Sequence, residues 1–328
     1  MLHHVLPKPE LAPTARAAVA ENGTATLYRF GDGQSTRGPV LLIPSLINRW
    51  YVLDLRAGAS LVEALVADGF DVFCLDWGAP QDEDRYLSWD DVLARLHRMV
   101  RRTLRIAGAE QLALVGYCMG ATLSAIYTAL YPDNVRALIN LAGPIDFEHA
   151  GMLGEMVDKD HFDAEHVANA GNVSAGQMQG GFSAMQPTLS FKKLVGITDG
   201  LFAGADLSGL GALEAWASDN IDFPGEAYRT YIGDLYQHNK LVDGQHRALG
   251  RRVDLKEITC PVLHIVAEAD TICPPDAAEA LGSHVSSTVV ETLRVPGGHV
   301  GAVVGSKARK IMYPGMSEFL TTHLEESS

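Results

Sequence analysis

A run of β-forming residues, QLALV, leads directly into Gly116-Tyr117-Cys118-Met119-Gly120 and then into an amphipathic segment, ATLSAIYTALYP. This order predicts a strand, a sharp turn and a helix. A side chain held between two glycines on such a turn has a strained backbone and projects above the carboxyl edge of a parallel sheet. We therefore expect an α/β sheet that carries Cys118 at this edge.

The segments around the turn alternate between short apolar runs and helical patterns from Gly38 onward. PVLLIPSL and DVFCLDWG have the character of buried strands, and WDDVLARLHRMVRRTLRIAG has that of a long amphipathic helix. Short buried strands separated by such helices indicate a mostly parallel sheet with helices on both faces. Together with the turn at Cys118, the pattern predicts an α/β-hydrolase fold.

The strand signal disappears between residues 148 and 245, where helical pieces rich in Gly, Met and polar residues replace it, and it returns with CPVLHIVAEAD. The sheet is completed only after this stretch, which favours one domain with an insertion over two domains. We expect an N-terminal segment at 1–38, a core at 39–147 and 246–328, and a mainly helical cap at 148–245. Residues 176–182 of the cap are a candidate gate or dimer contact.

Composition limits the classes of function. The chain has 328 residues, of which 47% are hydrophobic, and a formal charge of -14. Such a chain buries a large core, and its acidity argues against a nucleic-acid binder or an anionic-membrane binder. No apolar run approaches the roughly 20 residues of a membrane span, and the start lacks the apolar core of a secretory signal, so we expect a cytoplasmic protein.

The four cysteines are Cys74, Cys118, Cys260 and Cys273, and no two of them form a CxxC pair. This argues against a disulfide framework or a structural zinc site, and we expect neither a metal nor a cofactor. An isolated cysteine usually packs as a small apolar residue. Cys118 is different, because the helix that follows points its positive end at the sulfur and favours the thiolate.

Two partners for Cys118 follow in the chain order of this fold, nucleophile, acid and histidine. Asp270 ends the run CPVLHIVAEAD, and His299 lies in the glycine-rich loop after TVVETLRV. A free thiol has a pKa near 8.5, so His299 is expected to take the proton of Cys118, while Asp270 orients the imidazole. We predict Cys118, His299 and Asp270 as a catalytic triad.

The tetrahedral oxyanion formed in acyl transfer needs two backbone N–H donors. One is predicted to be the amide of Met119, directly after the nucleophile. The other is expected from the loop after the first main strand, at Leu46 or at Ile47. The sequence leaves these two residues as alternatives.

These residues resemble the catalytic subunit of the class III polyhydroxyalkanoate synthases, over about residues 39–319. The shared motifs span the core and the insertion; they include Leu46-Ile47-Asn48-Arg49, Leu75-Asp76-Trp77-Gly78, the Cys118 turn, Glu226-Ala227-Tyr228-Arg229, Gln237-His238-Asn239-Lys240-Leu241 and Gly297-Gly298-His299. The elbow differs from the common family pattern, because Ala121 stands in place of a second glycine and Tyr117 and Met119 flank the cysteine.

The resemblance implies a homodimer that polymerises (R)-3-hydroxyacyl-CoA, usually 3-hydroxybutyryl-CoA, and releases CoA. It also implies a second, noncatalytic synthase subunit and attachment to polyester granules. By position, Cys118 would hold the growing chain as a thioester, His299 would activate Cys118, and Asp270 would assist the incoming hydroxyl. The differences at the elbow keep open an alternative, a cysteine-dependent acyltransferase or thioesterase that uses each acyl group once.

Overall fold

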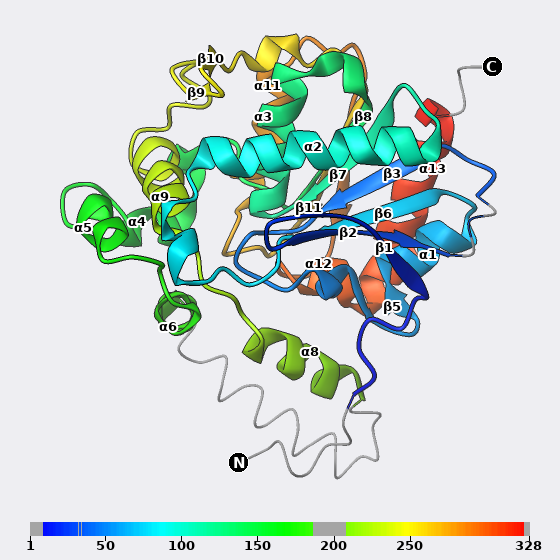
Figure 1. The fold of residues 1–328 in the computed structure, drawn as a ribbon, viewed down its shortest axis with the longest axis horizontal. Coiled ribbons are helices and arrows are strands. Elements are labelled where there is room, and N and C mark those ends of the chain that lie inside the picture. The colour runs from blue at the N-terminus through cyan, green and yellow to red at the C-terminus, as the bar shows by residue number, and fades with distance from the viewer. Residues whose placement is uncertain (1–8, 32, 34, 186–207, 325–328) are drawn as a thin grey trace.

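The computed structural model describes residues 9–31, 33, 35–185 and 208–324. Its centre is an eight-stranded sheet in the order β1-β2-β6-β3-β7-β8-β11-β12 (Figure 1). The strands of this sheet are β1 Arg16–Asn22, β2 Ala25–Phe30, β3 Pro39–Ile43, β6 Asp71–Asp76, β7 Leu112–Tyr117, β8 Val135–Leu141, β11 Val262–Ala267 and β12 Val290–Val295. Short pairs lie outside it, β4 Asp54–Arg56 with β5 Ala59–Ser60 and β9 Arg247–Ala248 with β10 Arg251–Arg252.

The six strands from β6 to β12 in this order run parallel, and β2 joins β6 in the antiparallel sense. The helices are α1 Leu61–Ala67, α2 Trp89–Ala107, α3 Met119–Leu130, α4 Gly151–Met156, α5 Ala164–Asn169, α6 Ala175–Met185, α8 Ser208–Ser218, α9 Gly225–Tyr228, α10 Pro275–Glu279, α11 Leu281–His284, α12 Gly301–Val304 and α13 Tyr313–Leu324. This architecture confirms the predicted α/β-hydrolase fold.

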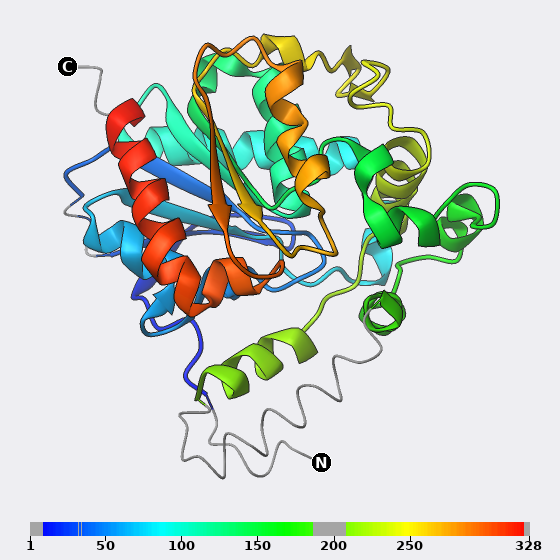
Figure 2. The same cartoon turned by 180° about the vertical axis from the view of Figure 1, so that it is seen from behind.

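Alternating side chains of each buried strand divide the core between the two faces of the sheet. In β3, Leu41 and Ile43 join the cluster under α2 and α3, while Val40 and Leu42 join the cluster under α1 and α13. Successive residues of a strand point to opposite faces, so apolar runs of this kind require cover on both. Figure 1 shows α2 across one face, and Figure 2 shows α13 across the other.

The long helix α2 begins and ends where its sequence supplies caps. The Ser88 side chain accepts a hydrogen bond from the Asp91 amide, and Asp91 reciprocates at the Ser88 amide. Gly108 ends the helix in the left-handed conformation, with φ of 66°. These signals satisfy backbone groups that a helix leaves unpaired at each end.

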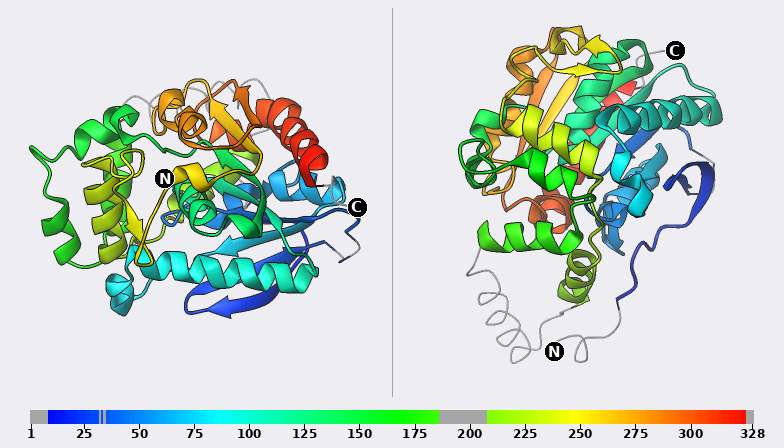
Figure 3. Two further views of the ribbon diagram at one scale, coloured as in Figure 1. Left: turned by 90° about the horizontal axis from the view of Figure 1, so that it is seen from above. Right: turned by 60° about the vertical axis from the view of Figure 1, so that its left-hand side comes forward.

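The described parts of the predicted cap region, residues 148–185 and 208–245, consist mainly of helices. Helices α4, α5, α6 and α9 gather at one end of the sheet (Figures 1 and 3), and α9 continues into a π-helical turn, η6, at Arg229–Tyr236. One isolated bridge, between Val173 and Phe223, links two parts of this region. The N-terminal segment contributes β1 and β2, which form one edge of the eight-stranded sheet.

Candidate active site

The elbow at Cys118 lies between the end of β7 and the start of α3. Cys118 has φ of 56° and ψ of -128°, a conformation that L-residues rarely adopt. A Cβ on Gly120 would lie 2.1 Å from the Ile43 carbonyl oxygen, and one on Gly116 would lie 2.3 Å from the Ala121 Cα. The two glycines therefore let the strand, the turn and the helix approach closely enough to hold the strained residue.

The structure brings His299 and Asp270 into direct contact. The Nδ1 of His299 lies 2.7 Å from Oδ2 of Asp270, and both side chains are buried. The other oxygen of Asp270 accepts hydrogen bonds of 2.9 Å from the amides of Ile272 and Cys273. The carboxylate is thus fixed in one orientation and presents one oxygen to the imidazole.

Cys118 lies close enough to His299 for its side chain to raise the pKa of the imidazole. Because Nδ1 faces Asp270, Nε2 is the nitrogen that remains for the sulfur. Burial alone would lower the pKa of His299, but the negative charges of Cys118 and Asp270 and the hydrogen bond to Asp270 outweigh it and raise the pKa to about 10. The arrangement favours a protonated imidazole at His299.

Met119 and Ile47, two of the predicted oxyanion residues, line the same cavity. Met119 is the first residue of α3, where backbone N–H groups lack partners within the helix. Leu46 is also buried but does not line this cavity. Trp77 fixes the start of the loop that follows β3, because its Nε1 donates a hydrogen bond to the Pro44 carbonyl at 3.0 Å.

The cavity beside the elbow has a volume of about 250 Å³ and a mostly apolar wall. Its lining joins the elbow and the loop after β3 to the cap; it includes Ile47, Met119, Leu153, Met156, Val157, Phe162, Met178, Gly181, Phe223, Tyr228, Tyr231, Ile232 and Tyr236. A pocket of this size and character suits an acyl chain. Of the predicted gate, Gln177, Met178 and Gly181 contribute to the wall.

Two sets of aromatic residues lie near the site, and the sequence alone did not assign them a role. The rings of Tyr231 and Tyr236 meet edge to face, with centroids 5.3 Å apart, and burial raises the pKa of both hydroxyls. The Tyr117 ring stacks on His299. The aromatic residues in EAYRTYIGDLY were a usable signal, since their density is high for a segment with no strand pattern.

The other three cysteines lie in structural positions. Cys74 and Cys273 are buried, and Cys260 is partly buried before β11. In the described residues, no group of three or more His, Cys, Asp or Glu side chains is arranged to hold a metal ion. None of the described helices combines the length and the apolar character needed to cross a bilayer.

Comparison with known sequences identifies proteins related to this chain. The family profile of the alpha/beta hydrolase fold matches residues 38–305. The poly(3-hydroxyalkanoate) polymerase subunit PhaC of Allochromatium vinosum is 34% identical over 312 residues, which cover 93% of this chain and 88% of that protein. The protein of the same name from Synechocystis is 33% identical, with 94% and 84% covered. A third, from Haloferax mediterranei, is 34% identical over 88% of this chain, which spans 59% of that longer protein.

Solved structures share the fold at low sequence identity. A monoglyceride lipase from Saccharomyces cerevisiae superposes with a TM-score of 0.62 over 97% of this chain and all of the other, at 17% identity. A structure described with carboxylesterases of Nitrososphaera gargenis gives a TM-score of 0.58 at 16% identity, with 94% and 99% covered. These likenesses concern the arrangement of strands and helices.

Proposed function

Because the chain belongs to the poly(3-hydroxyalkanoate) polymerase family and has the α/β-hydrolase fold, we propose that it joins (R)-3-hydroxyacyl units into a polyester through a thioester on Cys118. The observation that carries this proposal is the cysteine elbow, which lies close to the buried His299–Asp270 pair and beside an apolar cavity lined by Met119. The substrate is proposed to be an acyl-CoA, and 3-hydroxybutyryl-CoA is the first candidate.

The first step loads the enzyme. The Cys118 thiolate attacks the carbonyl carbon of the acyl-CoA thioester, and the negative charge moves to the carbonyl oxygen. Backbone N–H groups of Met119 and of Ile47 or Leu46 would stabilise that oxyanion. The bond between the carbonyl carbon and the CoA sulfur then breaks, and His299 gives its proton to this sulfur. CoA leaves as the neutral thiol and the acyl group stays on Cys118.

A thiolate suits this step because one thioester is exchanged for another at little cost in free energy. A serine ester would lose part of the driving force that the next transfer uses. The backbone at Cys118 holds the sulfur in position before the substrate arrives, which lowers the cost of orientation.

The second step forms the ester. The 3-hydroxyl oxygen of another acyl-CoA attacks the carbonyl carbon of the Cys118 thioester, and its proton passes to His299. Cys118 leaves as a thiolate paired with the imidazolium, and the lengthened CoA thioester reloads Cys118 by the first step. Both oxygens of Asp270 are engaged and its side chain is fully buried. Asp270 would therefore assist the hydroxyl through His299.

Water competes with the 3-hydroxyl for the Cys118 thioester. A polymerase must exclude water from this step, whereas a thioesterase uses water to release the free acid. The mainly apolar wall contributed by the cap supports the transfer to an alcohol, because it offers water few hydrogen-bond partners. The resemblance to the family further supports a homodimer, a noncatalytic synthase subunit as partner, and work at the surface of polyester granules in the cytoplasm. Nucleic acid is not a proposed partner.

The test supplies (R)-3-hydroxybutyryl-CoA, follows the released thiol, and separates insoluble polyester from free hydroxy acid. We expect polyester from the wild-type chain and neither acylation nor CoA release from Cys118→Ala. Cys260→Ala is the matched control, since that thiol lies before β11 and outside the cavity lining. Free acid in proportion to the released CoA would favour the thioesterase alternative.

A further inference from the structure

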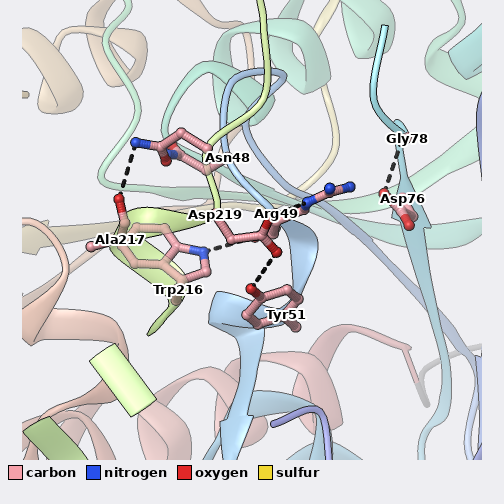
Figure 4. A network of polar contacts seen from close by, with 9 residues as sticks. Asn48, Arg49, Tyr51, Asp76, Gly78, Trp216, Ala217 and Asp219 are labelled. Atoms are coloured by element: carbon pink, nitrogen blue, oxygen red, sulfur yellow. Dashed lines mark hydrogen bonds and ion pairs between the residues drawn. The ribbon is translucent and has the colours of Figure 1, made fainter. Parts of the chain in front are cut away.

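The loop that follows β3 and the end of cap helix α8 meet in a cluster of polar contacts that the proposed chemistry has not used. Figure 4 shows the Asp219 carboxylate between Arg49 and Tyr51. Its Oδ1 lies 3.2 Å from Nε of Arg49, and its Oδ2 accepts a hydrogen bond of 2.7 Å from the Tyr51 hydroxyl. One cap side chain thus holds two residues of this loop.

Further contacts surround the carboxylate. The Arg49 carbonyl accepts a hydrogen bond of 2.9 Å from the Trp216 indole, and the Ile47 carbonyl accepts one of 3.3 Å from the Ile221 amide. The Asn48 side chain donates to that of Asn220 at 2.7 Å. These contacts and those of Asp219 join residues 47–51, here called the oxyanion loop, to residues 216–221, here called the clasp.

The oxyanion loop is held from two sides. The core holds its approach through the hydrogen bond from Trp77 to the Pro44 carbonyl. The clasp holds the next residues by two of their backbone carbonyls as well as by side chains. Each carbonyl shares a peptide plane with the N–H of the next residue, so these contacts fix the planes on either side of Leu46 and Ile47. The short stretch between the fixed planes, which carries the N–H groups of Leu46 and Ile47, is thereby restricted.

We propose that Asp219 is a positioning residue for the oxyanion loop, so that seating the clasp on this loop completes the oxyanion hole beside Cys118. The proposal rests on the proposed function, because it assigns the loop amide to the acylation step. The same clasp lies in the cap, whose residues form most of the cavity wall. Closing the cavity and completing the oxyanion hole would then be one event.

The contact between the clasp and the oxyanion loop is weak enough to form and break. The side chains of Arg49 and Asp219 are 29% and 46% exposed, and exposed ion pairs contribute little to stability. The fold is therefore expected to survive loss of the carboxylate, while the loop loses its fixed geometry. A donor misplaced by a fraction of an ångström is enough to weaken oxyanion stabilisation.

The first experiment compares two reactions of Cys118 in Asp219→Ala. Acylation by (R)-3-hydroxybutyryl-CoA passes through an oxyanion, whereas alkylation by iodoacetamide is a displacement at a saturated carbon and forms none. We expect the acylation rate constant at saturating substrate to fall by about tenfold or more, because removing an oxyanion donor costs roughly 100- to 1,000-fold and a misdirected donor should lose part of that. Alkylation should keep the wild-type rate or exceed it.

Two further variants sharpen this comparison. Tyr51→Phe removes one of the two contacts of Asp219 and should lower the acylation rate constant less than Asp219→Ala does. Asp160→Ala removes an exposed carboxylate elsewhere in the cap and should leave both reactions unchanged. Acylation at the wild-type rate in Asp219→Ala would overturn the proposal. Equal slowing of acylation and alkylation would also overturn it, because the defect would then lie at the thiolate.

A second measurement does not depend on the reaction. Hydrogen exchange of the amides in the oxyanion loop should be faster in Asp219→Ala than in the wild type and in Asp160→Ala. Unchanged exchange would contradict the clasp even if the activity fell. If the wild-type chain accepts no acyl-CoA, the proposed function fails, and the exchange result still decides whether Asp219 positions the loop.

Discussion

The ring of Tyr117 stacks on the imidazole of His299, with centroids 5.2 Å apart and planes inclined by 29°. Tyr117 directly precedes the nucleophile, so the same turn supplies the sulfur of Cys118 and the ring that packs against the general base, His299. The Tyr117 side chain is buried, which keeps water from that side of the imidazole. A flat aromatic face also stabilises a cation, and His299 is expected to be the cation of this site.

Replacing Tyr117 should therefore alter acylation through His299. Aromatic pairs contribute about 0.5–1.5 kcal/mol beyond the area they bury, which corresponds to roughly 2- to 12-fold in rate. Tyr117→Leu should lower the acylation rate constant by a factor in this range, while Tyr117→Phe, which keeps the ring, should stay within about twofold of the wild type. Stopped-flow measurement of CoA release checks this. Equal losses in both variants would assign the effect to the hydroxyl.

Asp270→Asn should disturb the orientation of the His299 imidazole without disturbing the fold. The new amide oxygen can still accept the Ile272 and Cys273 amides, but its NH₂ group would face Nδ1 of His299 and favour the wrong imidazole tautomer. We expect acylation to fall by about 10³- to 10⁴-fold, as in related triads, with near-normal thermal stability. Single-turnover CoA release and thermal unfolding report the two quantities.

The control for that variant is Asp276→Asn, an exposed carboxylate near the same loop, which should keep wild-type acylation. The comparison also tests the division of labour that the family resemblance implies. If Asp270 acts on the incoming hydroxyl directly, Asp270→Asn should load Cys118 normally and fail only in elongation. Loss of loading would instead support its action through His299.

Local sequence was enough to predict the fold and to identify the elbow. A strand pattern that runs into Gly116 and Cys118 and then a helix pattern leaves few alternative geometries, since the glycines are required for close packing. Asp270 and His299 each follow a strand of the same sheet, so their order and their edge could be inferred. The contact between them could then be expected before any coordinates.

Contacts across the insertion could not be predicted in this way. Arg49 and Asp219 lie far apart in the chain, and no periodicity relates a loop after β3 to the end of α8. The contact that accommodates Ala121, the residue that differs from the common family elbow, could not be predicted either. Ala121 is accommodated because Gly143 faces it without a side chain, as a Cβ there would lie 2.1 Å from the Cβ of Ala121. Such pairings depend on tertiary packing.

Thiol reactivity offers a prediction about the whole set of cysteines. Burial raises the pKa of Cys260 to about 12 and raises the pKa values of Cys74 and Cys273 well above the ordinary range. The thiolate is the reactive form, so these three should react slowly. Iodoacetamide at neutral pH should label one site rapidly in the folded chain, and peptide mass analysis should locate it at Cys118. Rapid labelling of Cys260 would contradict this prediction.

The titration of His299 should depend on Cys118. Burial lowers the pKa of the imidazole, but the charge of Cys118 and the charge and hydrogen bond of Asp270 raise it from 6.5 to about 10. Because the folded value is the higher one, the stability contributed by protonating His299 is complete below about 6.5 and is lost as pH rises through about 10. Cys118→Ala removes one of the two anions, so its His299 should titrate at lower pH.

Proton NMR of the imidazole resonances, with His299→Gln to assign the signal, measures this shift. The same midpoint in the wild type and in Cys118→Ala would show that the sulfur carries no charge near His299. In the wild type, acylation should decline as pH passes about 10, because the imidazole can no longer protonate the leaving CoA sulfur.

The size of the cavity predicts selectivity for acyl length. Val157 is buried at the end of α4 and lines the cavity of about 250 Å³, and a phenylalanine at this position would fill part of that space. Each methylene that is no longer accommodated should cost about 0.8 kcal/mol, or roughly fourfold in kcat/KM. Val157→Phe should therefore discriminate against 3-hydroxyhexanoyl-CoA and 3-hydroxyoctanoyl-CoA relative to 3-hydroxybutyryl-CoA. Met152→Leu, on the exposed face of α4, should leave the ratios unchanged. Unaltered ratios in Val157→Phe would show that the acyl chain lies elsewhere.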